Sequence, residues 1–290
     1  MNAHPSRAEI IISALPFIRA FSGKTVVVKY GGNAMVDPSL TTAVMQDLIL
    51  MHLVGMQPVA VHGGGPQIDR AMKTSGLTPT FIQGLRVTDA DTMRIVERVL
   101  VGEINQEIVA AIGRLGGAAI GLSGKDGGLI RARKAAPATA QDGQPVDLGL
   151  VGEVVQVDPR PIRTLLDAGY IPVVAPTAGD PAGATYNINA DVVAGEVAAA
   201  LTAEKLVLLT DTDGIFDRQG GLLSTLTQQD VERLISDKTI SRGMLPKVRA
   251  CLTALKAGVR KTHIINGTRP HALIEELLTP EGVGTEIVAG

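Results

Sequence analysis

Residues 58–68 read PVAVHGGGPQI, a short apolar run followed almost directly by three glycines and a proline. The run is typical of a buried strand, and Pro66 suits the first turn of a following helix. Residues 28–33 (VKYGGN) and 120–128 (IGLSGKDGG) repeat this change from strand to glycine turn. Because glycine has no Cβ atom, such turns let backbone amides approach an anion. Tight turns also need glycine for structural reasons, but two turns with consecutive glycines in one chain favour an anion site.

Short apolar runs alternate with helix-sized intervals along the chain. The interval 89–115 carries apolar residues near the helical period, and Asp89 and Asp91 suit its start. This alternation predicts a mostly parallel sheet covered by helices, with ligands bound beyond the carboxyl ends of the strands. The predicted buried strands are Thr25–Tyr30, Pro58–His62, Gly117–Leu122, Ile171–Pro176, Lys205–Thr210 and Thr262–Ile265.

The composition restricts the class of protein. With 290 residues, 45% of them hydrophobic and 19% charged, the chain is expected to be globular with one or two lobes. A formal charge of −2, only 2% aromatic residues and no tryptophan argue against nucleic acid as a partner. No apolar run reaches the roughly 20 residues that span a bilayer, so we expect no membrane association.

Cysteine usage indicates a reducing compartment. Cys251 is the single cysteine, and no cysteine–histidine cluster has the spacing of a zinc site, so no structural metal is expected. We therefore predict a cytoplasmic protein.

Three further segments have a predicted role. Residues 131–150 lack either period and are expected to form an excursion or hairpin, while a lobe boundary fits residues 172–181. Before the first strand, Ser6 and Glu9 have capping-box spacing at the start of a helix that Pro16 should kink. This helix either packs on its own subunit or serves as an exposed arm for oligomerisation.

Two common nucleotide-binding signatures are missing. Asp126 follows Gly124-Lys125, so the chain has no Walker sequence G-x-x-x-x-G-K-[ST]. Ile68 takes the third glycine position of a G-x-G-x-x-G pattern that begins at Gly63. A Walker-type NTPase and a nicotinamide-dependent dehydrogenase are therefore both disfavoured.

Five motifs occur in the order of a known family: KYGG at 29–32, VHGGGPQI at 61–68, GLRVT at 84–88, NINAD at 187–191 and TDTDGI at 210–215. They resemble the amino-acid kinase superfamily, in particular the acetylglutamate kinase family, and the resemblance covers about residues 25–290. The resemblance implies a three-layer α/β/α sandwich around a mostly parallel open sheet with two lobes. Residues 1–24 would form an oligomerisation arm, 25–176 the acceptor-binding lobe and 177–290 the nucleotide-binding lobe.

The resemblance also implies the catalytic groups. Lys29 and the amides of Gly32 and Gly64 would contact the transferring phosphoryl group, Lys247 would approach from the nucleotide side, and Asp191 would orient both lysines. Phosphoryl transfer spreads negative charge over oxygens, so catalysis rests mainly on positioned positive charge and N–H donors. A buried Lys29 needs a partner, whereas Lys247 could simply be solvated and Asp191 could be an ordinary acid at a helix start.

Substrate contacts follow from the same motifs. Arg86 suits a carboxylate because its guanidinium pairs in a bidentate manner, and Asn187 can both donate to and accept from an acetamido group. The γ-carboxylate of N-acetyl-L-glutamate is already ionised near neutral pH, so no general base is needed, and His62 is interpreted as a hydrogen-bonded residue at a strand end. The implied acceptor residues are Gly64, Gly65, Arg86, Asn187 and Asn189. The implied residues for ATP, which would arrive with Mg²⁺, are Lys29, Gly31, Gly32, Asp211, Asp213, Gly214, Phe216 and Lys247.

The N-terminal helix resembles the extension of arginine-inhibited hexameric members, in which such helices interlace dimers. The implied contacts of L-arginine are Lys205, His263, Glu281 and Gly284, and a nitrogen-signalling protein of the PII type is a conceivable partner. The expected activity is formation of N-acetyl-L-glutamyl 5-phosphate in arginine biosynthesis. An acylaminoadipate-type carboxylate kinase and a non-catalytic regulatory scaffold that binds arginine or nucleotide are the alternatives.

Overall fold

An eight-stranded sheet forms the centre of the protein in the computed structural model, which describes residues 6–139, 143–241 and 243–290. Neighbouring strands run parallel except for β15 and β16, which are antiparallel. In spatial order the strands are β14 (Thr225–Thr227), β16 (Thr285–Val288), β15 (Lys261–Asn266), β13 (Lys205–Thr210), β1 (Thr25–Tyr30), β2 (Gln57–His62), β10 (Ile171–Ala175) and β5 (Ala119–Ser123). The predicted strands are all present, with bounds that differ by at most two residues.

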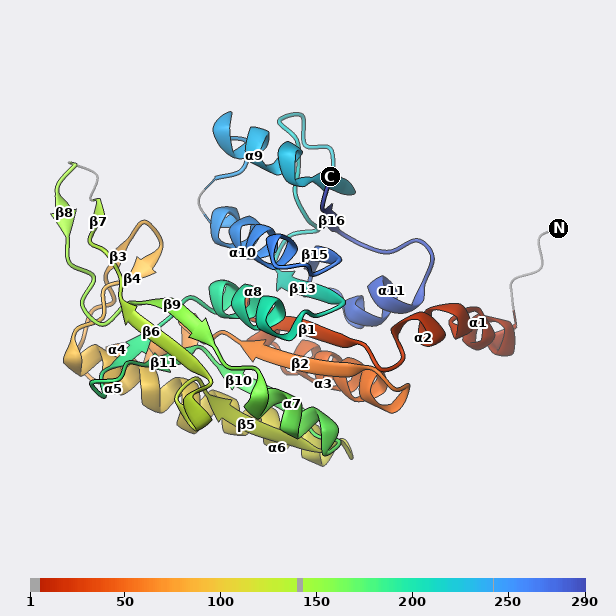
Figure 1. Cartoon of the computed structure of the whole chain (residues 1–290), viewed down its shortest axis with the longest axis horizontal. Coiled ribbons are helices and arrows are strands. Elements are labelled where there is room, and N and C mark those ends of the chain that lie inside the picture. Colours follow the sequence, from red (N-terminus) through yellow and green to blue (C-terminus); the bar gives the residue numbers. More distant parts are fainter. Residues whose placement is uncertain (1–5, 140–142, 242) are drawn as a thin grey trace.

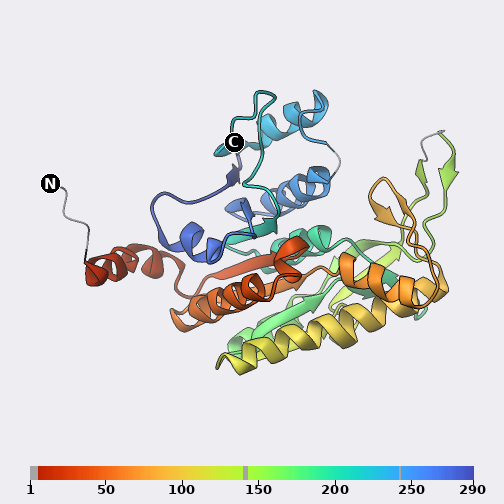
Figure 2. The same cartoon turned by 180° about the vertical axis from the view of Figure 1, so that it is seen from behind.

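Helices cover both faces of this sheet (Figures 1 and 2). Side chains alternate along β1, so Val26 and Val28 pack with one layer of helices and Val27 packs with the other. The first layer contains α3 (Pro38–Leu53), α5 (Ala90–Glu97), α6 (Asn105–Arg114) and α11 (Ala272–Leu278), and the second contains α7 (Arg160–Asp167), α8 (Ala190–Leu201) and α10 (Met244–Lys256). The predicted three-layer α/β/α fold is confirmed.

The helix predicted over 89–115 exists, with an unpredicted change of winding in its middle. The side chain of Asp89 accepts a hydrogen bond from the N–H of Thr92 and caps the start of α5. Between α5 and α6, the segment η2 (Arg98–Ile104) is a π-helix. Leu100 and Ile104 of this segment press against Gly64, where an added Cβ would lie only 2.7 Å and 2.6 Å from their methyl carbons. The packing of η2 therefore requires glycine at the turn after β2.

Smaller sheets extend from the central sheet on the side away from the N-terminus (Figure 1). The predicted excursion is confirmed, because the described residues between 131 and 150 contain most of one strand and a pair of antiparallel strands. One additional sheet has the order β12 (Thr185–Asn187), β11 (Thr177–Gly179), β6 (Ile130–Lys134) and β9 (Gly152–Val157). The two hairpins pair β3 (Phe81–Ile82) with β4 (Leu85–Arg86), and β7 (Ala138–Thr139) with β8 (Pro145–Val146).

The N-terminal segment forms two short helices that project from one end of the molecule (Figure 1). Ser6 and Glu9 make the predicted capping box at the start of α1 (Arg7–Ser13). The helix is interrupted at Ala14, and α2 (Leu15–Phe21) follows with Pro16 in its first turn. The predicted kink is therefore present. Over the part of the chain that the structure describes, we find no helix with the length and apolarity required to cross a membrane.

The remaining helices flank the glycine turns or the outer edge of the sheet. They are the 3₁₀ turns η1 (Gly32–Met35) and η3 (Asp126–Gly128), and the α-helices α4 (Gly65–Thr74) and α9 (Gln228–Ser236).

Candidate active site

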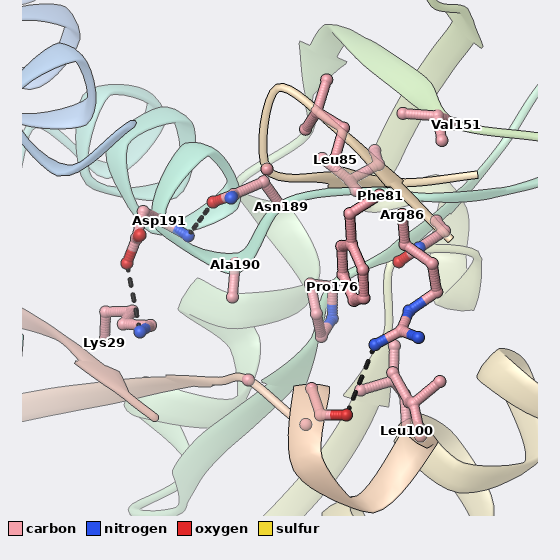
Figure 3. A pocket seen from close by; sticks show the side chains of 17 residues that line it. Lys29, Phe81, Leu85, Arg86, Leu100, Val151, Pro176, Asn189, Ala190 and Asp191 are labelled. Atoms are coloured by element: carbon pink, nitrogen blue, oxygen red, sulfur yellow. Dashed lines mark hydrogen bonds and ion pairs between the residues drawn. The ribbon is translucent and has the colours of Figure 1, made fainter. Parts of the chain in front are cut away.

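A cavity of about 190 Å³ lies beyond the carboxyl ends of β1 and β2. It brings together residues from distant parts of the chain, as expected at this edge of a parallel sheet. Figure 3 shows Lys29 and Asp191 on one side of the cavity and Arg86 on the other. The predicted site residues that line it are Lys29, Gly64, Gly65, Arg86, Asn187, Asn189 and Asp191.

Asp191 joins the two predicted catalytic lysines. Its Oδ1 lies 3.1 Å from Nζ of Lys29, near the end of β1, and its Oδ2 accepts a hydrogen bond of 3.1 Å from Nζ of Lys247, in the first turn of α10. Burial raises the pKa of Asp191, but the opposite effect of the charges on Lys29 and Lys247 is larger, so its pKa stays below the usual range. The carboxylate is therefore ionised and fixes both ammonium groups before any ligand binds.

The glycine turn after β1 has a backbone that other residues would adopt with strain. Gly32 has φ +69°, and a Cβ at this position would lie 2.7 Å from Oδ1 of Asp211. Asp211, a predicted nucleotide residue, thus lies directly beside the turn, and Gly31 within the turn is next to the ammonium group of Lys29. The first glycine turn and the end of β13 therefore meet at one place.

Arg86 is buried at the end of β4 and has several partners. Its Nη1 donates to Oδ1 of Asp69 at 2.6 Å, its Nη2 donates to the carbonyl oxygen of Gly65 at 3.4 Å, and its guanidinium carbon lies 4.7 Å from the ring centre of Phe81. The pairing with Asp69 was not predicted, because nothing in the sequence places α4 against β4.

The two asparagines of the 187–191 motif have different surroundings. Nδ2 of Asn187 donates to the Thr88 hydroxyl at 3.3 Å, which fixes the amide at the cavity wall. Oδ1 of Asn189 accepts hydrogen bonds from the N–H groups of Asp191 and Val192, so this residue is the N-cap of α8. Asn189 thus has a structural function in addition to lining the cavity.

His62 is a buried residue at the end of β2, consistent with the interpretation from sequence. Burial lowers its pKa to about 4, so the ring is neutral near pH 7. Its Nδ1 lies 2.8 Å from the carbonyl oxygen of Gly63, and its Nε2 lies 3.2 Å from Nδ2 of Asn105.

The third glycine turn lies away from the cavity. It follows β5, the last strand of the central sheet, and the N–H of Ser123 donates to Oδ2 of Asp126 within the turn itself. A Cβ at Gly124 would lie 1.9 Å from the carbonyl oxygen of Thr177, so packing explains glycine here.

The predicted nucleotide residues do not all face the same space. Gly214 and Phe216 line a second hollow of about 470 Å³, whose wall includes Met244 at the start of the helix that carries Lys247. Asp213 instead accepts a hydrogen bond of 2.8 Å from Nδ2 of Asn266 and lines a different pocket. In the described parts of the chain, no group of three or more His, Cys, Asp or Glu side chains is arranged to hold a metal ion.

The predicted arginine contacts lie together in a pocket of about 830 Å³ beside α2. Lys205, His263, Glu281 and Gly284 line this pocket, together with Phe17 and Phe21. Its floor contains Glu276, a buried acid that was not predicted. Oε1 of Glu276 accepts hydrogen bonds of 2.8 Å from Nζ of Lys205 and from Nε2 of His263. Burial lowers the pKa of His263, so Lys205 supplies the positive charge.

Glu276 is itself ionised in this cluster. Burial raises its pKa, but the hydrogen bond from His263, the charge of His263 when it is protonated and the charge of Lys205 together have the larger effect and lower it to about 2. An apolar helix, ALIEELL at 272–278, carries this acid on its buried side. A charged residue among apolar ones was the signal that could have identified it.

Comparison with known proteins agrees with the fold. A sequence profile of the amino acid kinase family matches residues 24–266. The acetylglutamate kinases of Moorella thermoacetica and Heliobacterium modesticaldum are 57% and 53% identical to this chain, over 97% of the chain and 97% and 98% of those proteins. The chain belongs to the amino acid kinase family. Within that family, these relatives, at more than half identity over nearly their whole length, are acetylglutamate kinases.

Solved structures with the same fold include two other activities. N-acetylglutamate synthase from Neisseria gonorrhoeae, complexed with coenzyme A and N-acetyl-glutamate, superposes with a TM-score of 0.85 at 29% identity, over 99% of this chain and 64% of the synthase chain. Carbamate kinase from Giardia lamblia bound to AMP-PNP has a TM-score of 0.66 at 18% identity, over 92% of this chain and 99% of the kinase chain. At that identity the second likeness concerns the fold alone.

Proposed function

We propose that this protein transfers the γ-phosphoryl group of ATP to the side-chain carboxylate of N-acetyl-L-glutamate, which forms N-acetyl-L-glutamyl 5-phosphate in arginine biosynthesis. The observation that carries the proposal is the ion-paired set of Lys29, Asp191 and Lys247 at one side of a cavity whose other side holds Arg86. The choice of N-acetyl-L-glutamate as the substrate is supported by the relatives that are acetylglutamate kinases.

The two sides of the cavity suit the two ends of an acylated dicarboxylate. Arg86 receives the α-carboxylate, and Asn187 faces the acetamido group, which both accepts and donates hydrogen bonds. The γ-carboxylate then points toward Lys29 and the glycine turns. Because that carboxylate is already an anion near pH 7, it attacks the phosphorus without loss of a proton.

During transfer, positive charge and N–H groups stabilise the negative charge that spreads over the phosphoryl oxygens. Lys29 acts from the acceptor side and Lys247 from the nucleotide side, while the amides of Gly32 and Gly64 donate hydrogen bonds. Asp191 holds the two ammonium groups in place, so little reorganisation is needed when charge develops. The oxygen bridging the β- and γ-phosphates leaves with ADP, and the new bond joins phosphorus to the γ-carboxylate oxygen.

The nucleotide is proposed to occupy the hollow lined by Gly214 and Phe216, with Asp211 near its phosphates. Asp213 lines the pocket beside α2 instead and is not assigned to the nucleotide. Residues 177–290 would then be the nucleotide-binding lobe and 25–176 the main acceptor lobe. ATP is expected as its Mg²⁺ complex, since Mg²⁺ keeps several waters and binds chiefly through phosphate oxygens. When bound, Mg²⁺ would neutralise part of the negative charge on the phosphates.

Release of ADP together with trapping of the acyl phosphate by hydroxylamine tests the proposal. N-acetyl-L-glutamate should give equal amounts of ADP and hydroxamate, and its kcat/KM should exceed that of glutamate, aspartate, UMP and an acylated aminoadipate. A preference for the longer aminoadipate would favour the alternative kinase. Formation of ADP without hydroxamate would refute phosphoryl transfer to a carboxylate. If Lys29→Ala and Lys247→Ala both keep full turnover, the mechanism is refuted.

We further propose that the pocket beside α2 binds L-arginine as an inhibitor and that α1 and α2 assemble dimers into a hexamer. Lys205 and Glu276 offer charges of both signs, as an amino acid requires, and α2 supplies Phe17 and Phe21 to the same pocket. The adjoining helix α1 exposes Ile10, Ile11 and Ile12 at 57%, 71% and 64% of their surface. Such a row of exposed apolar side chains is typical of an interaction surface.

Deletion of residues 1–22 tests this regulatory proposal. The truncated protein should keep its kcat, change from hexamer to dimer in light scattering, and lose most of its inhibition by arginine. The variants Ile10→Ser and Ile11→Ser should weaken the hexamer in the full-length chain without removing Phe17 and Phe21. A dimer in the intact protein would refute the role of the arm.

A further inference from the structure

Asp69 holds the substrate-facing arginine without lining the cavity. Its Oδ1 accepts a hydrogen bond of 2.6 Å from Nη1 of Arg86. Asp69 is not one of the described residues that line the cavity. The Arg86 side chain is only 6% exposed, whereas that of Asp69 is 36% exposed. The Asp69 carboxylate is therefore a partly exposed partner of a guanidinium charge that is itself buried.

Within the described part of the chain, the hydrogen bonds of this guanidinium all go to a single face of α4. Nη2 donates to the carbonyl oxygen of Gly65, Nη1 donates to Asp69 one turn later, and Nη1 also lies 3.4 Å from the sulfur of Met72. Residues spaced by three or four positions share one face of a helix. Since the same helix begins at the second glycine turn, one rigid element places both the phosphate-facing amides and the partner of Arg86.

The contacts to α4 and to Phe81 leave part of the guanidinium free for a ligand. A guanidinium carries five N–H donors in a fixed plane. Nη1 donates to Asp69 and Nη2 uses one hydrogen for Gly65, both on α4, and the guanidinium carbon lies over the Phe81 ring, while Arg86 lines the cavity (Figure 3). The edge formed by Nε and the second hydrogen of Nη2 is therefore the edge that a carboxylate can engage with two parallel hydrogen bonds.

We propose that Asp69 is a positioning residue for the acceptor: it holds Nη1 of Arg86 so that the opposite edge of the guanidinium is presented to the α-carboxylate of the substrate. This inference rests on the proposed function, because it takes the acceptor to be an acylated amino acid with a free α-carboxylate. An arginine side chain without this partner would have to be ordered by each substrate molecule, at an entropic cost.

The expected effect lies in acceptor binding rather than in the chemical step. Asp69→Ala should raise the KM for N-acetyl-L-glutamate about 10-fold, below the roughly 10²-fold effect that a 1 Å misplacement can cause. The kcat and the KM for ATP should stay within about twofold, because Lys29, Lys247 and Asp191 are untouched. Asp69→Asn keeps an oxygen that accepts from Nη1, so its KM should return to within about threefold of the original.

A substrate analogue separates positioning from a general loss of structure. In N-acetylglutamic acid α-amide, a neutral carboxamide replaces the α-carboxylate. The original enzyme should prefer the acid over the amide, and Asp69→Ala should reduce this preference at least threefold, since a misaligned guanidinium gains less from the charge. In an Arg86→Ala background, Asp69→Ala should have no further effect on either substrate.

The matched control is Asp91→Ala, which removes an exposed Asp–Arg pair of 2.7 Å between Asp91 and Arg94 on α5. Its KM should not change. An unchanged KM in Asp69→Ala, a KM in Asp69→Asn as high as in Asp69→Ala, or an unchanged preference for acid over amide would each overturn the positioning role. If the original enzyme fails to phosphorylate N-acetyl-L-glutamate at all, the proposed function is refuted instead.

Discussion

Replacing Asp191 by asparagine should reduce kcat about 10²- to 10³-fold, the usual effect of losing one preorganised donor. Each of its two ion pairs is 3.1 Å long, which corresponds to an attraction of about 5 kcal/mol at an effective dielectric constant near 20 before desolvation is subtracted. Asparagine has the same size, but one of its terminal atoms is an NH₂ donor that faces an ammonium group. Only one of Lys29 and Lys247 can then keep its acceptor.

The Michaelis constant for the acceptor shows whether the effect is confined to the chemical step. Steady-state ADP release should give a KM for the acceptor within about threefold of the original, because Arg86 and Asn187 are unchanged. The control is Asp230→Asn, which makes the same charge change in the first turn of α9 and should keep full activity. If Asp191→Asn retains more than a tenth of the original kcat, the carboxylate does not fix the lysines as described.

Three further substitutions test the glycine turn and the buried acids. Gly32→Ala should lower kcat at least about 10-fold, because its Cβ would meet Asp211. The control is Gly23→Ala: Gly23 has a similar φ of +72° but open space around the added Cβ, so this change should affect stability alone. Asp47 is a buried residue of α3 whose Oδ1 lies 2.6 Å from Nδ1 of His271. Burial raises its pKa to about 6 despite this hydrogen bond, so the folded form holds the proton more tightly than the unfolded chain and stability is lost as pH rises through 6. Urea unfolding of Asp47→Asn should therefore show no such loss, with a gain of up to about 3 kcal/mol at pH 8; an equal loss in the variant would contradict this. The pKa of Glu276 is lowered to about 2, so the stability it gives is present above pH 4.5 and is lost as pH falls toward 2. Glu276→Gln should cost about 3 kcal/mol at pH 7, and a difference from the original that does not shrink below pH 4 would show that the charge is not responsible.

Much of the fold follows from local patterns in the sequence. The apolar run of Thr25–Tyr30 is a buried strand because its apolar side chains pack alternately on two helix layers. The capping box of Ser6 and Glu9 involves residues only three positions apart. The π-helical winding of Arg98–Ile104 is different, because it is matched to the turn at Gly64 in another part of the chain. Sequence periodicity carries no signal of that kind.

The candidate site could be predicted where motifs carry it and not where packing alone creates it. Lys29, Asp191 and Lys247 lie far apart in the sequence, and the motif resemblance brought them together before the structure did. Asp69 and Glu276 belong to no motif, and their partners come from other elements. The placement of those elements against one another is a property of the whole fold.

The position of β1 in the sheet has a consequence for synthesis of the chain. β2 follows β1 closely in the sequence and can pair with it early in synthesis, whereas the other neighbour of β1, β13, begins only at Lys205. At about 5 to 20 residues per second, the central strand waits on the order of ten seconds or more with one edge unpaired. An apolar edge of this kind is a template for pairing with other chains. Nascent or truncated chains that end before residue 205 should therefore be prone to aggregation and dependent on chaperones.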